Sequence, residues 1–131
     1  MVINEKPPVW DMIVKAFPVH WDDGIIVTYG ENIYSKEAIP PLKVAHELVH
    51  VKQQTTMGKD IWWERYIRDN DFRLSQEIEA YTEEYSKAKQ VIKDRNALAK
   101  YLFTIATHLS SSMYGSIITH SEALKSIKNG K

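Results

Sequence analysis

The sequence contains no cysteine. Disulfide bonds, cysteine-bound zinc sites and thiol catalysis are therefore excluded, and the absence fits a reducing compartment. No stretch approaches the roughly 18 consecutive apolar residues that a membrane-spanning helix needs. The N-terminal residues also lack the basic patch and apolar run of a signal peptide. We therefore expect a cytoplasmic protein with no membrane partner.

An excess of charge of either sign is also missing, because 17 lysines and arginines balance 17 aspartates and glutamates. This balance predicts no bulk attraction to nucleic acid. The sequence contains no phosphate-binding loop, no Ser/His/Asp arrangement and no nucleic-acid motif. A length of 131 residues, 44% of them hydrophobic and 26% charged, predicts one globular domain over residues 1–131.

The pattern of apolar residues, prolines and glycines predicts an α+β fold that is mostly helical. Asp23-Gly24, between β-forming residues, predicts a β-hairpin, and residues 32–34 predict a short third strand. The small sheet is thus expected to be antiparallel. A capping box at Thr119 to Glu122 predicts the start of the last helix. Helices are predicted over residues 9–17, 41–57, 61–67, 75–93, 97–110 and 119–127, with Asp60 and Asn96 as caps for the third and fifth.

The most informative motif is H-E-x-x-H, formed by residues 46–50. It is the zinc-binding signature of metallopeptidases. His46 and His50 are four residues apart, so a helix places both imidazoles on one face, where both can bind one ion. Glu47 then lies beside the metal and can take a proton from a water that zinc activates. Leu48 and Val49 are expected to face the core.

A catalytic zinc usually has three protein ligands, and this motif supplies two. The extended motif with a third histidine is excluded, because Gln53 and Thr56 occupy the positions that need glycine and histidine. The cysteine ligand of peptide deformylases is also missing. A glutamate from a downstream helix is the remaining common solution. Glu77 and Glu79 are both candidates, and about 200° of helix separates them, so only one can face the metal.

At these residues the chain resembles minimal gluzincin metallopeptidases, whose downstream helix carries E-x-x-A-[D/x], as Glu77-Ile78-Glu79-Ala80-Tyr81 does. The resemblance implies a zincin-like arrangement, in which the sheet packs on the H-E-x-x-H helix and on the second, glutamate-bearing helix. It also implies Zn²⁺ as the cofactor, Glu77 as the third ligand, and a peptide or protein substrate. Tyr81 replaces the aspartate that often supports a ligand histidine. Its hydroxyl is expected instead to orient a ligand or to donate to an oxyanion.

The order of the remaining segments is similar to that of short metallopeptidase-like proteins encoded by phages and prophages. The similarity covers the strand ending at Tyr29-Gly30, the zinc helix, the Trp/Tyr-rich helix, the Glu-Ala-Tyr helix and a Tyr114-Gly115 tail. It implies that the protein works in the cytoplasm of a bacterium or of a phage-infected host cell. A chain of this length has little room for the second subdomain that forms a wall of the cleft in larger relatives. A protein partner that completes the cleft is therefore compatible with the sequence.

We therefore expect zinc-dependent peptide-bond hydrolysis with Glu47 as the general base. One alternative is a catalytically silent zincin-fold protein that acts by binding, in phage assembly or host interaction. A zinc hydrolase for another amide, or a toxin-like protease of a phage defence system, is also compatible. Glu47 separates the classes, because an enzyme without it keeps the metal and loses turnover, whereas a binding protein keeps its effect.

For several other polar and aromatic residues, a structural role and a functional role are both compatible with the sequence. Aromatic residues between the two zinc-site helices are expected mainly in the core, with a substrate groove as the alternative: Trp62, Trp63 and Tyr66. Nearby arginines are expected to be solvated or ion-paired rather than oxyanion donors: Arg65, Arg68 and Arg73. The remaining histidines are expected to be structural or superficial: His20, His108 and His120. Residues 29–34 are a candidate edge strand for an extended peptide.

Overall fold

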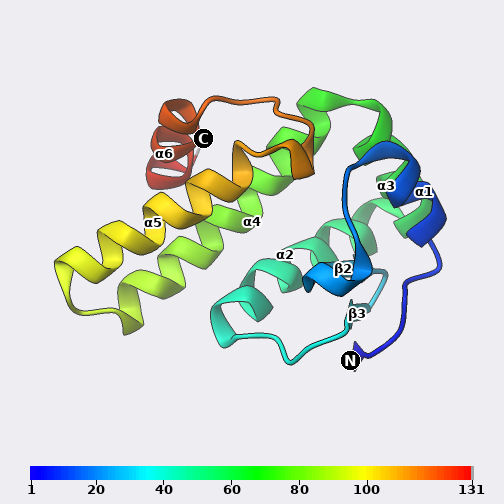
Figure 1. The fold of residues 1–131 in the computed structure, drawn as a ribbon, viewed down its shortest axis with the longest axis horizontal. Coiled ribbons are helices and arrows are strands. Elements are labelled where there is room, and N and C mark those ends of the chain that lie inside the picture. The colour runs from blue at the N-terminus through cyan, green and yellow to red at the C-terminus, as the bar shows by residue number, and fades with distance from the viewer. Residues whose placement is uncertain (131) are drawn as a thin grey trace.

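A computed structural model describes residues 1–130 and shows an α+β fold that is mostly helical, with a small mixed sheet (Figure 1). No helix within these residues is both long enough and apolar enough to cross a membrane. The helices are α1 (Trp10–Ala16), α2 (Pro41–Met57), α3 (Lys59–Arg68), α4 (Asn70–Val91), α5 (Arg95–Leu109) and α6 (His120–Asn129). The strands are β1 (Val2–Ile3), β2 (Ile26–Tyr29) and β3 (Asn32–Ser35), and the short 3-10 turns are η1 (Trp21–Asp23) and η2 (Ser112–Tyr114).

The sheet has the order β1-β3-β2, with β2 and β3 antiparallel and β1 parallel to β3. The expectation of a purely antiparallel sheet is therefore wrong. The hairpin expected at Asp23-Gly24 is also wrong, because Gly24 (φ 78°) ends η1 instead. The turn at Gly30 (φ 65°) closes the hairpin. Both glycines adopt positive φ, which a 3-10 terminus and a tight hairpin turn require alike.

Helix α2 confirms the prediction for residues 41–57. Pro41 occupies its first turn, where a missing N–H costs nothing, and Gly58 (φ 98°) ends it. The expected burial of Leu48 is wrong, because this side chain is 53% exposed. The buried face of α2 consists of polar residues: His46, Glu47, His50 and Gln54.

The expected loop at residues 68–71 is much shorter in the structure. Asp69 separates α3 from α4, and its carboxylate accepts the Phe72 N–H, so that α4 begins five residues before the predicted position. Asp60 does not cap α3, because its carboxylate accepts the Tyr29 hydroxyl at 2.7 Å. Asp94, not Asn96, caps α5. The capping box at Thr119 and Glu122 is confirmed.

Two buried clusters hold these elements together. The N-terminal part of the chain and α3 form the aromatic cluster, whose buried members are Val9, Trp10, Ile13, Phe17, Val27, Trp62, Trp63, Tyr66 and Phe72. Helices α4, α5 and α6 form the C-terminal cluster, whose buried members are Tyr81, Ile105, Ala106, Leu109, Ala123 and Ile127. The long helix α4 contributes to both and runs beside α2 (Figure 1).

Candidate metal centre

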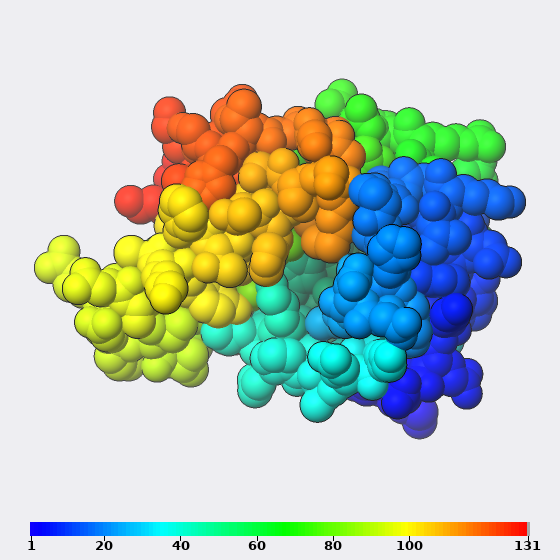
Figure 2. Space-filling model, in the orientation of Figure 1, coloured from blue at the N-terminus to red at the C-terminus, as the bar shows by residue number. Residues whose placement is uncertain are grey.

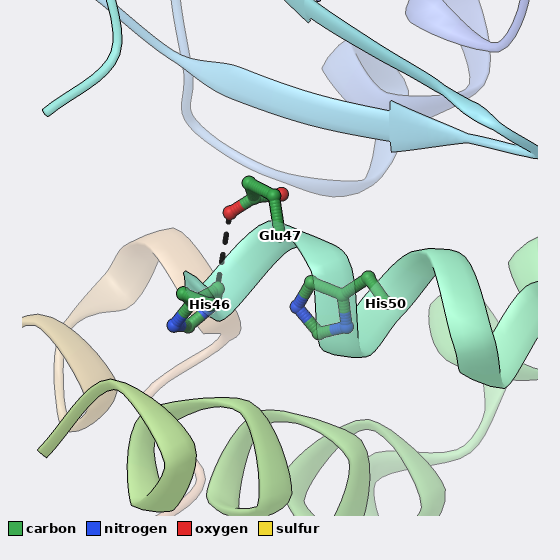
Figure 3. A group of neighbouring side chains, drawn as sticks. All are labelled: His46, Glu47 and His50. Atoms are coloured by element: carbon green, nitrogen blue, oxygen red, sulfur yellow. Dashed lines mark ion pairs between the residues drawn. The ribbon is translucent and has the colours of Figure 1, made fainter. Parts of the chain in front are cut away.

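Helix α2 brings the residues of the H-E-x-x-H motif together, as the sequence predicts. One ligand atom each from His46, Glu47 and His50 lies within 4.8 Å of the other two, and all three residues are buried. Figure 3 shows the two imidazoles side by side along α2, one turn apart, and the Glu47 side chain pointing toward the sheet. The spacing of i and i+4 on one helix produces this pairing of the imidazoles.

Helix α4 adds Glu77 to this group. Its Oε1 lies 3.1 Å from His46 Nε2 and 3.2 Å from His50 Nε2. Ligands about 2.0 Å from a tetrahedral zinc would be about 3.3 Å apart, so these separations match the donor spacing that zinc needs. Glu79 is exposed. Of the two candidate glutamates, only Glu77 therefore lies against both histidines.

The other nitrogen of each imidazole has its own partner. His46 Nδ1 lies 3.0 Å from Glu84 Oε1, and His50 Nδ1 lies 2.8 Å from Gln53 Oε1. An acceptor at Nδ1 keeps the proton on that nitrogen and turns the Nε2 lone pair toward the shared centre. Glu84 therefore lies where a carboxylate can fix the orientation of the His46 imidazole. Helical spacing places Glu84, seven residues or about two turns after Glu77, on the same face of α4, but it does not reveal that His46 lies opposite that face.

Glu84 is fully buried and is held by three donors. Besides His46, it contacts Lys43 Nζ at 2.9 Å and accepts the Tyr101 hydroxyl. Burial opposes its charged form, but His46 and Lys43 together lower the pKa of Glu84. A buried carboxylate with this many partners stays ionised and keeps a fixed position beside His46.

The charges around the histidines favour a cation between them. Burial disfavours a charged imidazole, but Glu77 and Glu84 outweigh it and raise the pKa of His46 to about 10. Burial also disfavours a charged Glu77, yet the two histidines hold the pKa of Glu77 far below its usual value. Three buried carboxylates, including Glu47, surround two imidazoles. This donor set suits a divalent ion that prefers nitrogen and oxygen ligands.

Glu47 faces the sheet rather than Glu77. Its Oε1 accepts the Thr28 hydroxyl at 3.0 Å, and its Oε2 lies 3.8 Å from His46 Nε2. Burial raises the pKa of Glu47. A higher pKa makes this carboxylate a stronger proton acceptor, and Thr28 from β2 fixes its orientation. Thr28 was not identified from the sequence.

The predicted role of Tyr81 is only partly reflected in its contacts. Its ring lies against His46, with ring centroids 4.3 Å apart, and its hydroxyl is 2.8 Å from the Tyr114 hydroxyl. Burial raises the pKa of both hydroxyls well above the usual value, so they remain donors. Tyr114 comes from η2, 33 residues away, and no local pattern marks it.

The aromatic residues of α3 belong to the core and to the site at once. Trp62, Trp63 and Tyr66 are buried, as expected for core residues. Tyr66 also donates its hydroxyl to Glu77 Oε2, and Trp62 donates to Gln76 at 2.9 Å. The aromatic cluster therefore fixes Glu77, the third candidate ligand, through the hydrogen bond from Tyr66.

The arginines divide into two groups. Arg65 and Arg68 are exposed and lie 3.9 Å from Asp69 and 3.3 Å from Glu64, as expected for ion-paired surface residues. The expectation fails for Arg73, which is 3% exposed and donates to the backbone carbonyls of Tyr66 and Tyr114. It ties η2 to α3, because a guanidinium can donate in several directions at once.

A cavity of about 300 Å³ opens beside these residues. Its wall includes the motif residues, Glu77 and Tyr81. Figure 2 shows α2 set deep between the orange turn after α5 and the blue N-terminal segment. His108 is exposed and lines this cavity, whereas His20 and His120 are not among the described residues that line it.

Comparisons with protein-family models, with curated proteins and with solved structures found no match. The site is therefore interpreted from its own geometry and chemistry. Two imidazoles and a carboxylate converge on one point, and a second carboxylate and a cavity lie beside it. Such an arrangement can hold a metal ion, accept a proton and admit a small part of a larger substrate.

Proposed function

We propose that this protein is a zinc-dependent peptidase in which His46, His50 and Glu77 bind Zn²⁺ and Glu47 is the general base. The observation that carries the proposal is the position of Glu77 Oε1, within 3.2 Å of both Nε2 atoms. Two helices from different parts of the chain supply these three donors, and Glu77 Oε1 lies from each histidine nitrogen at about the spacing of a tetrahedral zinc shell. The sheet beside α2 and the packing of α4 against α2 support a zincin-like arrangement.

A bound zinc ion would supply the Lewis acid that polarises a substrate carbonyl and lowers the pKa of the attacking water. Glu47 takes the proton from that water, because its carboxylate is buried beside the histidines and its pKa is raised. The Thr28 hydroxyl keeps one carboxylate oxygen in place while the other stays on the side of His46. The same carboxylate then returns the proton to the departing amine.

The Tyr81–Tyr114 pair supplies hydroxyl donors near the site. Both hydroxyls face one another at 2.8 Å, and both residues line the cavity. A hydroxyl of this pair can rotate to donate to the oxygen that becomes negative during attack. Tyr81 retains the oxyanion role expected for it, and we add Tyr114 as its partner.

The first test is metal content. The protein, purified without added metal, is analysed by elemental mass spectrometry together with Glu77→Ala and Glu79→Ala. We expect about one zinc per chain in the parent and in Glu79→Ala, and none in Glu77→Ala, because only Glu77 contacts the histidines. Absence of zinc from the parent after zinc is supplied would refute the proposal.

The second test separates an enzyme from a zinc-binding module. Glu47→Gln keeps the shape of the side chain but removes the proton acceptor. We expect unchanged zinc content and a fall in peptide hydrolysis of about 100- to 10,000-fold, as general-base contributions usually are. A parent protein that binds zinc yet cleaves no member of a broad peptide panel would favour the binding module.

A further inference from the structure

Charge is distributed unevenly along this chain, although the total is balanced. Residues 1–85 contain nine lysines and arginines against fifteen aspartates and glutamates. Residues 86–130 contain seven lysines and arginines against two acidic residues. The end of α4 and the helices α5 and α6 therefore carry a net positive charge, while the part of the chain with the candidate metal centre is net negative. Such a division between two parts of a chain is typical of a protein that binds an anionic partner.

Five of the seven cations lie on the hairpin that α4 and α5 form. All five are exposed and flank the turn between the two helices: Lys87, Lys89, Lys93, Arg95 and Lys100. Figure 1 shows this turn, in yellow-green and yellow, at one end of the molecule beyond α2 and α6, and Figure 2 shows that it projects from the surface. Residues 87–100 are called the basic tip below.

The acidic residues near the basic tip leave most of its charge uncompensated. Asp94 caps α5, where its carboxylate accepts the Ala97 N–H at 3.1 Å. Glu83 Oε1 lies 3.7 Å from Lys87 Nζ, but an ion pair this exposed contributes little. Within residues 1–130, the other four cations of the tip form no ion pair. The basic tip therefore presents its positive charge to solvent.

An apolar side chain lies at the apex of the basic tip. Val91 is the last residue of α4 and is 66% exposed, and Ile92 after it is half-buried. An anionic bilayer matches this combination, because its headgroups can face the cations and hydrocarbon lies just beneath them for the valine. A nucleic-acid backbone offers no apolar layer, and residues 87–100 contain no aromatic residue on which a base could stack. The apex thus favours a lipid surface over a nucleic acid.

We propose that the basic tip is a docking surface for an anionic membrane, in which Val91 enters the interface and the lysines and Arg95 face the headgroups. Among the described residues that line the cavity, none lies between Tyr81 and His108, so this surface is separate from the candidate metal centre. The expectation of no membrane partner rests on the lack of an apolar spanning segment, which peripheral docking does not need.

The test is co-sedimentation of the full chain with sucrose-loaded vesicles of two compositions: phosphatidylcholine alone, and phosphatidylcholine with about 30 mol% phosphatidylglycerol. At about 0.1 M salt we expect binding to the anionic vesicles and little binding to the neutral ones. At about 1 M salt the binding should be lost, because screening then shortens the reach of each charge to about 3 Å. Equal binding to both compositions, or binding to neither, would overturn the proposal.

A charge reversal locates the surface. Lys93→Glu with Arg95→Glu changes the turn and the first residue of α5, where a glutamate suits the helix. Affinity for the anionic vesicles should fall at least about twentyfold, because each basic residue near such a surface contributes about fivefold. The control, Lys6→Glu with Lys52→Glu, makes the same change in net charge at exposed positions outside the tip. An equal fall in the control would mean that total charge, not the tip, governs binding.

The apolar contact has its own variant. Val91→Asn should weaken vesicle binding about threefold to about tenfold, because it removes apolar area that the interface covers. Ile61→Asn is the control, at a 59% exposed position on α3, and should leave binding unchanged. An unchanged affinity in Val91→Asn would overturn the entry of Val91 into the interface. A protein that retards duplex DNA or single-stranded RNA at the same salt, yet ignores the vesicles, would replace the membrane with a nucleic acid.

Discussion

The two buried clusters of this protein differ in both composition and degree of burial. Among residues 1–130, six of the nine buried members of the aromatic cluster are aromatic, against one of six in the C-terminal cluster. Members of the C-terminal cluster are at most 2% exposed, whereas several members of the aromatic cluster reach 8%. Members of the aromatic cluster also line the cavity beside the candidate metal centre, which leaves part of their surface uncovered.

The difference shows which cluster lines the cavity and which cluster fixes the helices beside it. Residues of the aromatic cluster line much of the cavity, whereas Tyr81 is the buried member of the C-terminal cluster that does so, among the described residues. Helix α4 joins the two, with Phe72 in one and Tyr81 in the other. We infer that the C-terminal cluster fixes α4, and that the aromatic cluster shapes the space that a substrate would enter.

The largest expected effect contrasts one deletion in each cluster. Leu109→Ala should lower the free energy of unfolding by about 4 kcal/mol, because Leu109 is fully buried and its neighbours cannot close the gap. Ile13→Ala should cost about 2 kcal/mol, since Ile13 already borders a cavity and less new void is created. Urea denaturation followed by circular dichroism measures both values. A larger loss for Ile13→Ala would reverse the comparison.

The next effect concerns the Glu84 carboxylate, which links α4 to His46 on α2 and to Tyr101 on α5. Glu84→Gln removes the charge beside His46 Nδ1 but keeps the side-chain volume. Zinc affinity should fall by about tenfold to about hundredfold, as for other changes to the partners of metal-binding histidines. Competition with a fluorescent chelator measures the affinity. The control is Glu83→Gln, on the preceding residue. This change breaks only an ion pair with Lys87 and should leave zinc affinity unchanged.

A smaller effect is expected at the edge of the C-terminal cluster. Thr119→Ala removes the capping box of α6 and should lower the free energy of unfolding by about 1 kcal/mol. Zinc content should not change, because no residue of α6 lines the cavity beside the metal residues. Thr104→Ala, on the exposed face of α5, is the control, and its midpoint in urea should hardly move. Loss of zinc in the folded Thr119→Ala protein would contradict the inference that the C-terminal cluster fixes α4 without shaping the metal site.

The smallest effect tests the link between the aromatic cluster and Glu77. Tyr66→Phe removes the hydroxyl that donates to Glu77 Oε2. We expect zinc affinity to weaken about threefold to about tenfold, the value of one hydrogen bond. The chelator competition used for Glu84→Gln serves here as well. Tyr85→Phe, on α4 but outside the described lining of the cavity, is the matched control. An unchanged affinity in Tyr66→Phe would mean that the cluster contributes shape alone.

Local signals in the sequence were sufficient for part of the fold. The bounds of α2 follow from Pro41 and Gly58, and the capping box of α6 is visible as Thr119 and Glu122. The hairpin predicted at Asp23-Gly24 is wrong, because a hairpin turn and the end of a 3-10 helix both need a residue at positive φ. Only the later pairing of β2 with β3 through Gly30 distinguishes the two.

The inward face of α2 shows why hydrophobic periodicity can mislead at a site. Its buried residues are His46, Glu47, His50 and Gln54, while Leu48 is exposed. The helix thus buries polar groups that find partners across the interface, and periodicity assigns such groups to solvent. Glu77 was predicted in a different way, from the spacing of a known motif, and it lies against both histidines.

Glu84 and Tyr114 could not be predicted from the sequence. Glu84 meets His46 across 38 residues of chain, and Tyr114 meets Tyr81 across 33. Each contact depends on how α4 lies against α2 and on where η2 returns to the helices. No property of the two residues alone distinguishes them from the other glutamates and tyrosines of the chain.

Helix α4 places Glu77, Tyr81 and Glu84 on one face, at intervals of four and three residues. Each residue added to or removed from a helix turns everything beyond it by about 100°. A single deletion between Glu77 and Glu84 would therefore leave both glutamates in the chain but direct them to different sides. Related sequences should vary freely in the identity of exposed residues such as Glu79, yet keep the count of six residues between the two glutamates constant. Length, rather than composition, is the quantity that this stretch of chain must preserve.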